Sequence, residues 1–227
     1  MNIAILGTGM VGQTLAASLA ALGHDVAIGT RDVEALMART EPGPYGNPPY
    51  SAWAQEHPAV KTLALADAAA HGDILFNALS GANTLDGLRA AGAQNLAGKI
   101  LIDVANPLDF SGGFPPSLSV VNTDSLGEQI QREFPETKVV KALNTVNAML
   151  MVNPGQLADG EHSLFVCGND ADARSEVTRL LGEWFGWKDI IDLGDITNAR
   201  GTEQLLPLWV RLYGALQTPM FNFRIVR

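Results

Sequence analysis

The sequence predicts an α/β protein built on a doubly wound, mostly parallel sheet, with a small α/β extension at its C-terminal end. Short apolar runs alternate with segments of helical periodicity along most of the 227 residues. Repeated strand–helix alternation is typical of a parallel sheet covered by helices on both faces. A glycine-rich turn follows the first apolar run at once. The content of 47% hydrophobic and 17% charged residues indicates a globular chain with a sizeable core.

The N-terminal part of the chain shows the alternation most clearly. Residues 2–6 form an apolar run that is too short for a helix and is bounded by glycine, which predicts a buried strand. Leu15, Leu19 and Leu22 then recur at helical spacing, and Gly23 ends that helix in the usual C-terminal position. The next elements are predicted as strands at 25–28, 60–64 and 73–79 and as helices at 33–40, 51–56, 66–70 and 85–91.

Two loops rich in proline and glycine interrupt this pattern. Residues 41–50 (EPGPYGNPPY) contain four prolines and two glycines, which excludes regular structure and predicts a surface lid or an insertion. Residues 110–117 (FSGGFPPS) form the second such loop. The remaining elements are predicted as strands at 99–104, 138–143, 163–167 and 189–193 and as helices at 126–134, 171–185 and 202–217.

The candidate domain boundary is the Asn-Pro-Gly sequence at residues 153–155. We therefore expect a dinucleotide-binding domain at residues 1–152. A smaller part at 153–227 is expected to pack on it and to offer the surface for a second ligand and for a dimer partner. This C-terminal part is rich in aromatic residues, some one helical turn apart, which favours a homodimer through this region. These aromatic residues are Trp209, Tyr213, Phe221 and Phe223.

The glycine-rich turn carries the clearest chemical signal. The segment Gly7-Thr8-Gly9-Met10-Val11-Gly12 fits G-x-G-x-x-G, and it stands between a predicted strand and a predicted helix. Gly7 permits the tight turn, Gly9 lets backbone N–H groups approach a pyrophosphate, and Gly12 lets the helix pack closely on the strand. The free N–H groups of the helix N-terminus would then hold the diphosphate. The motif predicts a Rossmann-type dinucleotide site; the alternative is a glycine-rich turn without a ligand.

The end of the second predicted strand indicates which dinucleotide binds. An NAD site places a carboxylate there for the ribose hydroxyls, whereas this chain has Thr30 and Arg31. A guanidinium pairs with a 2′-phosphate through charge-assisted hydrogen bonds, and the Thr30 hydroxyl can donate another. NADP(H) is therefore favoured over NAD(H). NAD(H) remains an alternative because of Asp32: a shift of the strand end would bring its carboxylate to the ribose.

Composition and residue spacing exclude several classes of function. The net charge of −9 disfavours binding to nucleic acid or to an anionic membrane. No run approaches the ~20 apolar residues of a membrane span, and no signal peptide precedes the first strand, so a cytoplasmic location is expected. The single cysteine, Cys167, lies in an apolar run and is interpreted as an inert core thiol. The four histidines lack the spacing of a zinc site, and no metal site is expected.

Several of these segments together resemble a known family over nearly the whole chain. The glycine motif with Thr30-Arg31, residues 73–79 (DILFNAL) and residues 103–107 (DVANP) resemble the coenzyme F420-dependent NADP oxidoreductase family. Residues 139–145 (VVKALNT) are also similar to the NADPH-binding domain of the STEAP metalloreductases. Asn144 stands where F420-reducing members carry a histidine, and it is closer to the metalloreductase version.

The resemblance implies how the cofactor and its partner would be arranged. NADP(H) would lie along the C-terminal edge of the sheet, with a deazaflavin such as F420 or a flavin stacked against the nicotinamide. Hydride transfer between two rings needs positioning and exclusion of water more than an acid or a base, so no catalytic residue is named. The residues implied near the nicotinamide are Ala78, Leu79, Ser80, Asn106, Ala142, Asn144 and Thr145.

Two other functions remain open at this stage. One is an NADPH-dependent reductase of a small carbonyl or imine substrate. The other is a non-catalytic NADPH-binding module that senses redox state. The loops at 41–50 and 110–117 favour an enzyme, since both could close over a second ligand.

Overall fold

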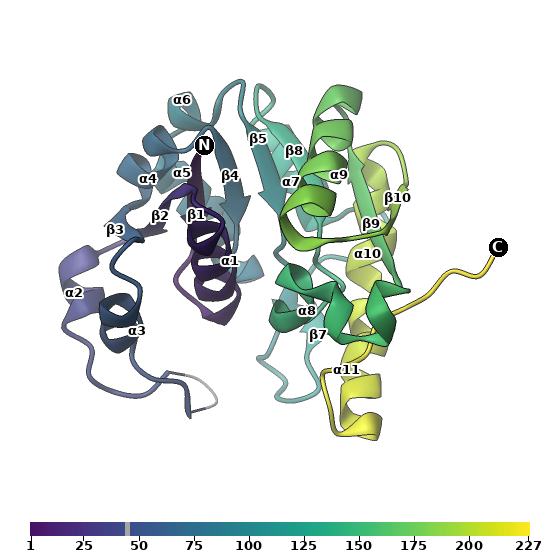
Figure 1. Ribbon diagram of the computed structural model, residues 1–227. Helices are drawn as coiled ribbons and strands as arrows, with labels where there is room; N and C mark the ends of the chain where they lie inside the picture. The colour runs from purple at the N-terminus through teal and green to yellow at the C-terminus, as the bar shows by residue number, and fades with distance from the viewer. Residues whose placement is uncertain (44–45) are drawn as a thin grey trace.

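Helices cover both faces of an eight-stranded sheet in the computed structural model, which describes residues 1–43 and 46–227 (Figure 1). The strands lie in the order β10-β9-β8-β5-β4-β1-β2-β3. Their bounds are β1 (Asn2–Leu6), β2 (Asp25–Thr30), β3 (Lys61–Ala64), β4 (Ile74–Asn77), β5 (Ile100–Asp103), β8 (Lys138–Ala142), β9 (Ser163–Gly168) and β10 (Asp189–Asp192). The predicted fold class is confirmed.

The chain reverses its direction of winding between β1 and β4. Strands β2 and β3 extend the sheet on one side of β1, and β4, β5 and β8 extend it on the other, all of them parallel. In doubly wound sheets, ligands bind outside the carboxyl ends of the strands at such a reversal. The glycine motif follows β1 directly and therefore lies at this point of the sheet.

Alternate side chains of β1 enter two different hydrophobic cores, as expected for a strand buried on both faces. Ile3 and Ile5 lie in one core, and Ala4 and Leu6 lie in the other. The first core is completed by α1 (Met10–Ala21), α3 (Tyr50–Glu56), α8 (Ala148–Val152) and α9 (Ala171–Phe185). The second is completed by α4 (Leu65–His71), α5 (Thr84–Ala91), α6 (Ala93–Leu96) and α7 (Leu126–Glu133).

Residues 153–227 continue this sheet and share its cores. Strand β9 pairs with β8 in the antiparallel direction, with Lys141 opposite Cys167, and β10 pairs with β9 in parallel. Leu164 and Val166 of β9 pack in the same core as Val140 of β8. The last two strands, β9 and β10, thus extend the edge of the same sheet.

Two predicted helices differ from those in the structure. The helix predicted at 202–217 is divided into α10 (Ala199–Gln204) and α11 (Leu206–Leu216). Pro207 lies in the first turn of α11 and has no N–H to donate to the carbonyl of Glu203, so a continuous helix is broken there. The helix predicted at 33–40 is α2 (Val33–Met37), which ends where Arg39 N donates to Leu36 O in an i→i+3 bond.

Several short elements were not predicted from the sequence. Helix α8 has five residues, too few for helical periodicity to be recognised. Strands β6 (Leu108–Asp109) and β7 (Ser117–Leu118) form a small antiparallel hairpin whose tip is most of the loop predicted at 110–117. Only two residues of each strand are paired, so the alternation that predicts a strand is absent.

Candidate active site

The three glycines of the motif occupy three different environments. Gly7 has φ +126°, and a Cβ on it would overlap the backbone of Ala78 at the end of β4. A Cβ on Gly12 would overlap the carbonyl oxygen of Gly7, whereas a Cβ on Gly9 would meet nothing within 4 Å. The turn is therefore closed on its inner side and open at Gly9. A turn of this shape would let the oxygens of a pyrophosphate approach the backbone closely.

Gly12→Ala is expected to lower the free energy of unfolding by about 1–3 kcal/mol, because the added methyl group meets backbone that cannot move aside. Gly214→Ala is the matched control. Gly214 lies in the exposed helix α11, a Cβ there meets nothing within 4 Å, and alanine should stabilise that helix by up to about 1 kcal/mol. Urea unfolding of both variants measures the difference. Equal effects of the two substitutions would contradict the close packing at Gly12.

The N-terminus of α1 is free to bind an anion. Gly9 is its N-cap residue, and no side chain among the described residues makes a capping hydrogen bond there. The helix has 12 residues, and its first turn leaves backbone N–H groups without intrahelical partners. The Gly7 N–H donates to Gly29 O of β2 over 3.1 Å, so the turn is tied to the strand that ends at Thr30. The glycine turn and the end of β2 are therefore neighbours.

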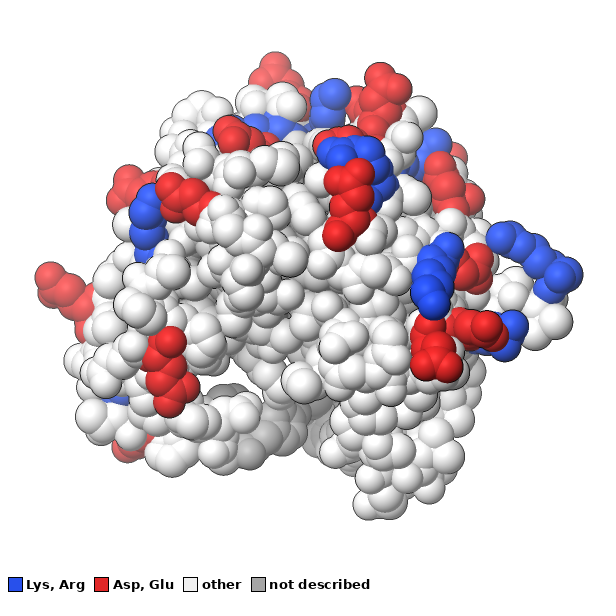
Figure 2. All heavy atoms as spheres, viewed as in Figure 1, with Lys and Arg blue, Asp and Glu red and all other residues white. Residues whose placement is uncertain are grey.

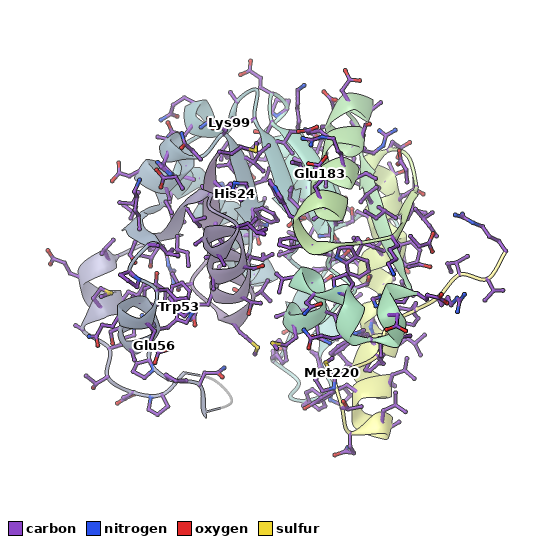
Figure 3. The ribbon with its side chains drawn as sticks, in the orientation of Figure 1. His24, Trp53, Glu56, Lys99, Glu183 and Met220 are labelled. Atoms are coloured by element: carbon purple, nitrogen blue, oxygen red, sulfur yellow. The ribbon has the colours of Figure 1, made fainter. Side chains whose placement is uncertain are left out.

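Two hollows meet at Gly9. The first, which we call the outer cleft, has a volume of about 1380 Å³ and lies between α3, the outward side of α1 and α8. Figure 2 shows this hollow at the lower edge of the molecule, where charged side chains are sparse, and Figure 3 shows Trp53 and Glu56 on α3 beside it. The second, the inner cavity, has a volume of about 630 Å³ and lies over the ends of β4 and β5.

The predicted site residues fall into four groups. Those that line the inner cavity are Gly9, Val11, Ala78, Leu79, Ser80 and Asn106. Those that line the outer cleft are Thr8, Gly9 and Met10. Those that are buried are Gly7, Gly12, Ala142, Asn144 and Thr145. Thr30 is half-buried and ends β2, and Arg31 is exposed and follows that strand; neither residue lines a hollow.

Asn144 and Asn106 hold each other through two hydrogen bonds. Asn106 Nδ2 donates to Asn144 O over 2.8 Å, and Asn144 Nδ2 donates to Asn106 Oδ1 over 2.9 Å. Asn144 is only 3% exposed, so its side chain orients Asn106, which does line the inner cavity. Leu143, just before it, has φ +63° although it is a buried leucine. Backbone strain of this kind persists where the surrounding structure requires it.

A buried charge cluster beneath the inner cavity was missed by the sequence reasoning. Lys141 Nζ lies 2.8 Å from Asp103 Oδ2, 2.7 Å from Glu203 Oε1 and 2.6 Å from Ala105 O. Asp103 Oδ1 also accepts from Asn77 Nδ2 and from the backbone N–H of Ala105. Burial lowers the pKa of Lys141, but the two carboxylates outweigh it and hold the pKa above its ordinary value. The amine is therefore charged.

This cluster fixes the loops that line the inner cavity. Asn77 Oδ1 accepts from Leu79 N, so the loop after β4 is tied to the cluster, and Ala105 ties the loop after β5. Glu203 accepts from the backbone N–H groups of Leu126 and Gly127, which begin α7. The sequence offered one signal, a lysine inside the apolar run VVKAL at 139–143.

Two cations near the glycine turn have no partner among the described residues. Of the 15 lysines and arginines, Arg31, Arg39 and Arg211 are those whose side chains make no hydrogen bond or ion pair in the part of the chain that the structure describes. Arg31 and Arg39 flank the short helix α2, and Arg39 lines the outer cleft with Thr8. Asp32, between them, accepts from Ala35 N over 2.9 Å as the N-cap of α2.

Other chemistry has little support in the described residues. Burial raises the pKa of the Cys167 thiol to about 12, so it stays protonated at neutral pH. No group of three or more His, Cys, Asp or Glu side chains within 1–43 and 46–227 is placed to hold a metal ion. In the same residues, no helix combines the length and the hydropathy of a membrane span.

The strand order, the glycine turn at the reversal and the cavities that meet there define a Rossmann-type dinucleotide-binding protein. The family described as NADP oxidoreductase, coenzyme F420-dependent, matches residues 2–107. A candidate F420-dependent NADP reductase from Arthrobacter sp. FB24 has a solved structure with a TM-score of 0.96 and 62% sequence identity, and the match covers 100% of both chains. The chain therefore belongs to the F420-dependent NADP oxidoreductase family, a family of NADP-dependent oxidoreductases.

Two curated relatives match over shorter lengths. The F420-dependent NADP reductase of Methanocaldococcus jannaschii is 30% identical over 147 residues, which is 64% of this chain and 64% of that protein. The metalloreductase STEAP3 of Rattus norvegicus is 33% identical over 125 residues, or 52% of this chain and 22% of that protein. The chain thus spans less than two thirds of the length of either relative. Both resemblances seen in the sequence are confirmed.

Proposed function

We propose that this protein transfers a hydride between NADP(H) and a flat acceptor ring of the deazaflavin or flavin type. The observation that carries the proposal is the glycine turn at the reversal of the sheet. It opens into the inner cavity, which gathers Ala78 to Ser80 and Asn106 from the ends of two strands. Bound NADPH supplies a hydride, which is two electrons with one proton, and becomes NADP⁺.

The residues of the site fit the cofactor. The backbone at Gly9 and the N-terminus of α1 would hold the pyrophosphate, and a Cβ at Gly9 alone among the motif glycines would enter open space. Arg31 and Arg39 are cations without partners in residues 1–43 and 46–227, which supports a 2′-phosphate between the end of β2 and the outer cleft. Asp32 is engaged as a helix cap, which favours NADP(H) further.

The inner cavity supports positioning rather than proton transfer. Its lining is mostly apolar, and Asp109 is the charged residue among the described residues that line it. The Asn106 amide is held by Asn144, so it can orient a polar group of the nicotinamide without rotating. These residues hold two rings in register and exclude water, which is what direct hydride transfer requires.

The first measurement is NADPH oxidation by the purified protein with F420, FMN and FAD offered in parallel, and with NADH as the control donor. We expect turnover with at least one of these acceptors and a preference for NADPH over NADH. Binding of NADPH without oxidation by any of the three would contradict the proposal and favour a reductase of another substrate or a redox sensor.

We further propose a homodimer through α11, the helix that projects at the lower right of Figure 1. Leu208, Tyr213 and Leu216 are 50%, 40% and 53% exposed on it. Trp209 packs against Tyr213 and Phe221, and its buried Nε1 has no hydrogen-bond partner among the described residues. Exposed apolar side chains gathered on one helix are typical of a protein–protein interface.

Leu216→Glu is expected to shift the protein from dimer to monomer in light scattering at micromolar concentration, because a carboxylate cannot be buried unpaired in an apolar interface. Leu22→Glu is the control, since Leu22 is also exposed but is the C-cap residue of α1, a helix that Figure 1 shows apart from α11. A monomeric wild-type protein, or equal behaviour of the two variants, would contradict the proposed interface.

A further inference from the structure

Two phenylalanines are exposed on the β6–β7 hairpin. Of the eight phenylalanines, only Phe110 and Phe114 have exposed side chains among the described residues, 54% and 65% respectively, and the other six are buried or half-buried. Burying a phenylalanine ring contributes roughly 1.5–3 kcal/mol, so a chain seldom leaves one in water without a partner. Burial within the described protein therefore does not explain why either position carries an aromatic ring.

The base of the hairpin is held firmly at the site. Leu108 N donates to Asn106 O over 2.8 Å, and Ser119 N donates to Pro107 O over 2.8 Å. Gly81, in the loop after β4, approaches Asn106 so closely that a Cβ there would overlap its carbonyl group. The hairpin is therefore anchored to the backbone of Asn106, one of the residues that would hold the nicotinamide.

The two exposed rings differ in position. Phe110 lines the inner cavity with Ala78 to Ala82 and Asn106, whereas Phe114 does not line it. Gly113 N donates to Phe110 O over 2.9 Å, so the turn that carries Phe110 is closed by a backbone hydrogen bond. The exposed ring of Phe110 therefore borders the cavity. The exposed ring of Phe114 lies on the same hairpin outside the cavity lining, so its substitution is a matched control.

The charge of the cavity restricts what can bind against that face. No lysine or arginine among the described residues lines the inner cavity, and Asp109 is the charged group there. Hydrogen bonds from the backbone N–H and the hydroxyl of Ser111 hold the pKa of Asp109 below its ordinary value, so the carboxylate remains ionised at neutral pH. An anionic ring would meet this carboxylate without a compensating cation.

We propose that Phe110 is the stacking surface for the acceptor ring, and that this subsite takes a flat, uncharged aromatic ring. The inference rests on the proposed function, because it assigns the ring beside the nicotinamide. It explains why a phenylalanine at the cavity mouth is left half in water: the acceptor covers it. Aromatic pairs of this kind prefer offset stacking, and they add affinity beyond the area they bury.

The test is the binding of riboflavin, an uncharged flavin, to the protein with NADP⁺ present, followed by flavin fluorescence. Phe110→Ala should raise the Kd of riboflavin about tenfold, and Phe110→Tyr, which keeps a ring, should restore it to within about twofold. Phe114→Ala should leave the Kd unchanged within about twofold. The Kd of NADPH, from its own fluorescence, should be the same in all four proteins.

The proposal would be overturned by the absence of riboflavin binding to the wild-type protein, by equal losses in Phe110→Ala and Phe114→Ala, or by an unchanged Kd in Phe110→Ala. A Phe110→Ala protein that loses NADPH binding in parallel would also overturn it, since the role would then be structural. Failure of the proposed function is distinguishable, because NADPH would bind and riboflavin would stack on Phe110 while no acceptor was reduced.

Discussion

Lys141→Met is expected to lower the free energy of unfolding by about 3–5 kcal/mol, because it leaves two carboxylates buried without a counter-charge. The side chains of Lys141 and Asp103 are 0% exposed and that of Glu203 is 1% exposed, so water cannot replace the lost ammonium group. Urea unfolding of the wild-type and variant proteins measures the effect.

A triple variant separates the missing charge from the missing packing. Lys141→Met combined with Asp103→Asn and Glu203→Gln removes all three charges at nearly constant volume. It should recover part of the lost stability, since a neutral cluster no longer contains unpaired charges. A triple variant less stable than Lys141→Met would contradict the electrostatic account and assign the loss to packing or to broken hydrogen bonds.

The same substitution should disturb the site as well as the fold. Lys141 holds Asp103, and Asp103 in turn holds Asn77 and the backbone of Ala105. Both contacts lead to loops that line the inner cavity, so their loosening should weaken NADPH binding even where the variant remains folded. Lys141 is therefore a positioning residue for the proposed reaction. Its effect should appear in the Kd of NADPH measured well below the denaturation midpoint.

Features that depend on neighbouring residues could be predicted from the sequence, whereas contacts between distant residues could not. Strand β1 and the glycine motif were predicted because each depends on residues within a few positions of one another. The contact of Asn144 with Asn106 spans 38 residues, and that of Lys141 with Glu203 joins strand β8 to helix α10, which lies much later in the chain. Such pairs exist only after the sheet has formed, so no local pattern contains them.

The β6–β7 hairpin could not be predicted from the sequence for a different reason. Its strands have two paired residues each, and the proline- and glycine-rich tip dominates the local composition. Arg39 was placed within a predicted helix, which says nothing about its partners. The lack of a hydrogen bond or ion pair at Arg39 points to a ligand only in the structure. There, twelve other lysines and arginines are paired among the described residues, and Arg39 lines the outer cleft.

Arg31→Ala is expected to weaken NADPH binding by about 2 kcal/mol, roughly thirtyfold in Kd, while the Kd of NADH stays unchanged. The reason is the charge-assisted hydrogen bond between a guanidinium and a 2′-phosphate, which NADH lacks. Arg39→Ala should act in the same direction, since its side chain is equally free and it lines the cleft beside Thr8. Fluorescence titration with both nucleotides measures the four constants.

Arg211→Ala provides the matched control, because Arg211 is also exposed and unpaired in the described structure but lies on α11, away from the glycine turn. It should leave both constants unchanged, which excludes a general effect of charge on a protein whose net charge is already −9. The loss in Arg31→Ala should also shrink as salt is raised, since exposed charges are screened. An equal loss for NADPH and NADH would mean that Arg31 supports the adenosine half of the site without reading its phosphate.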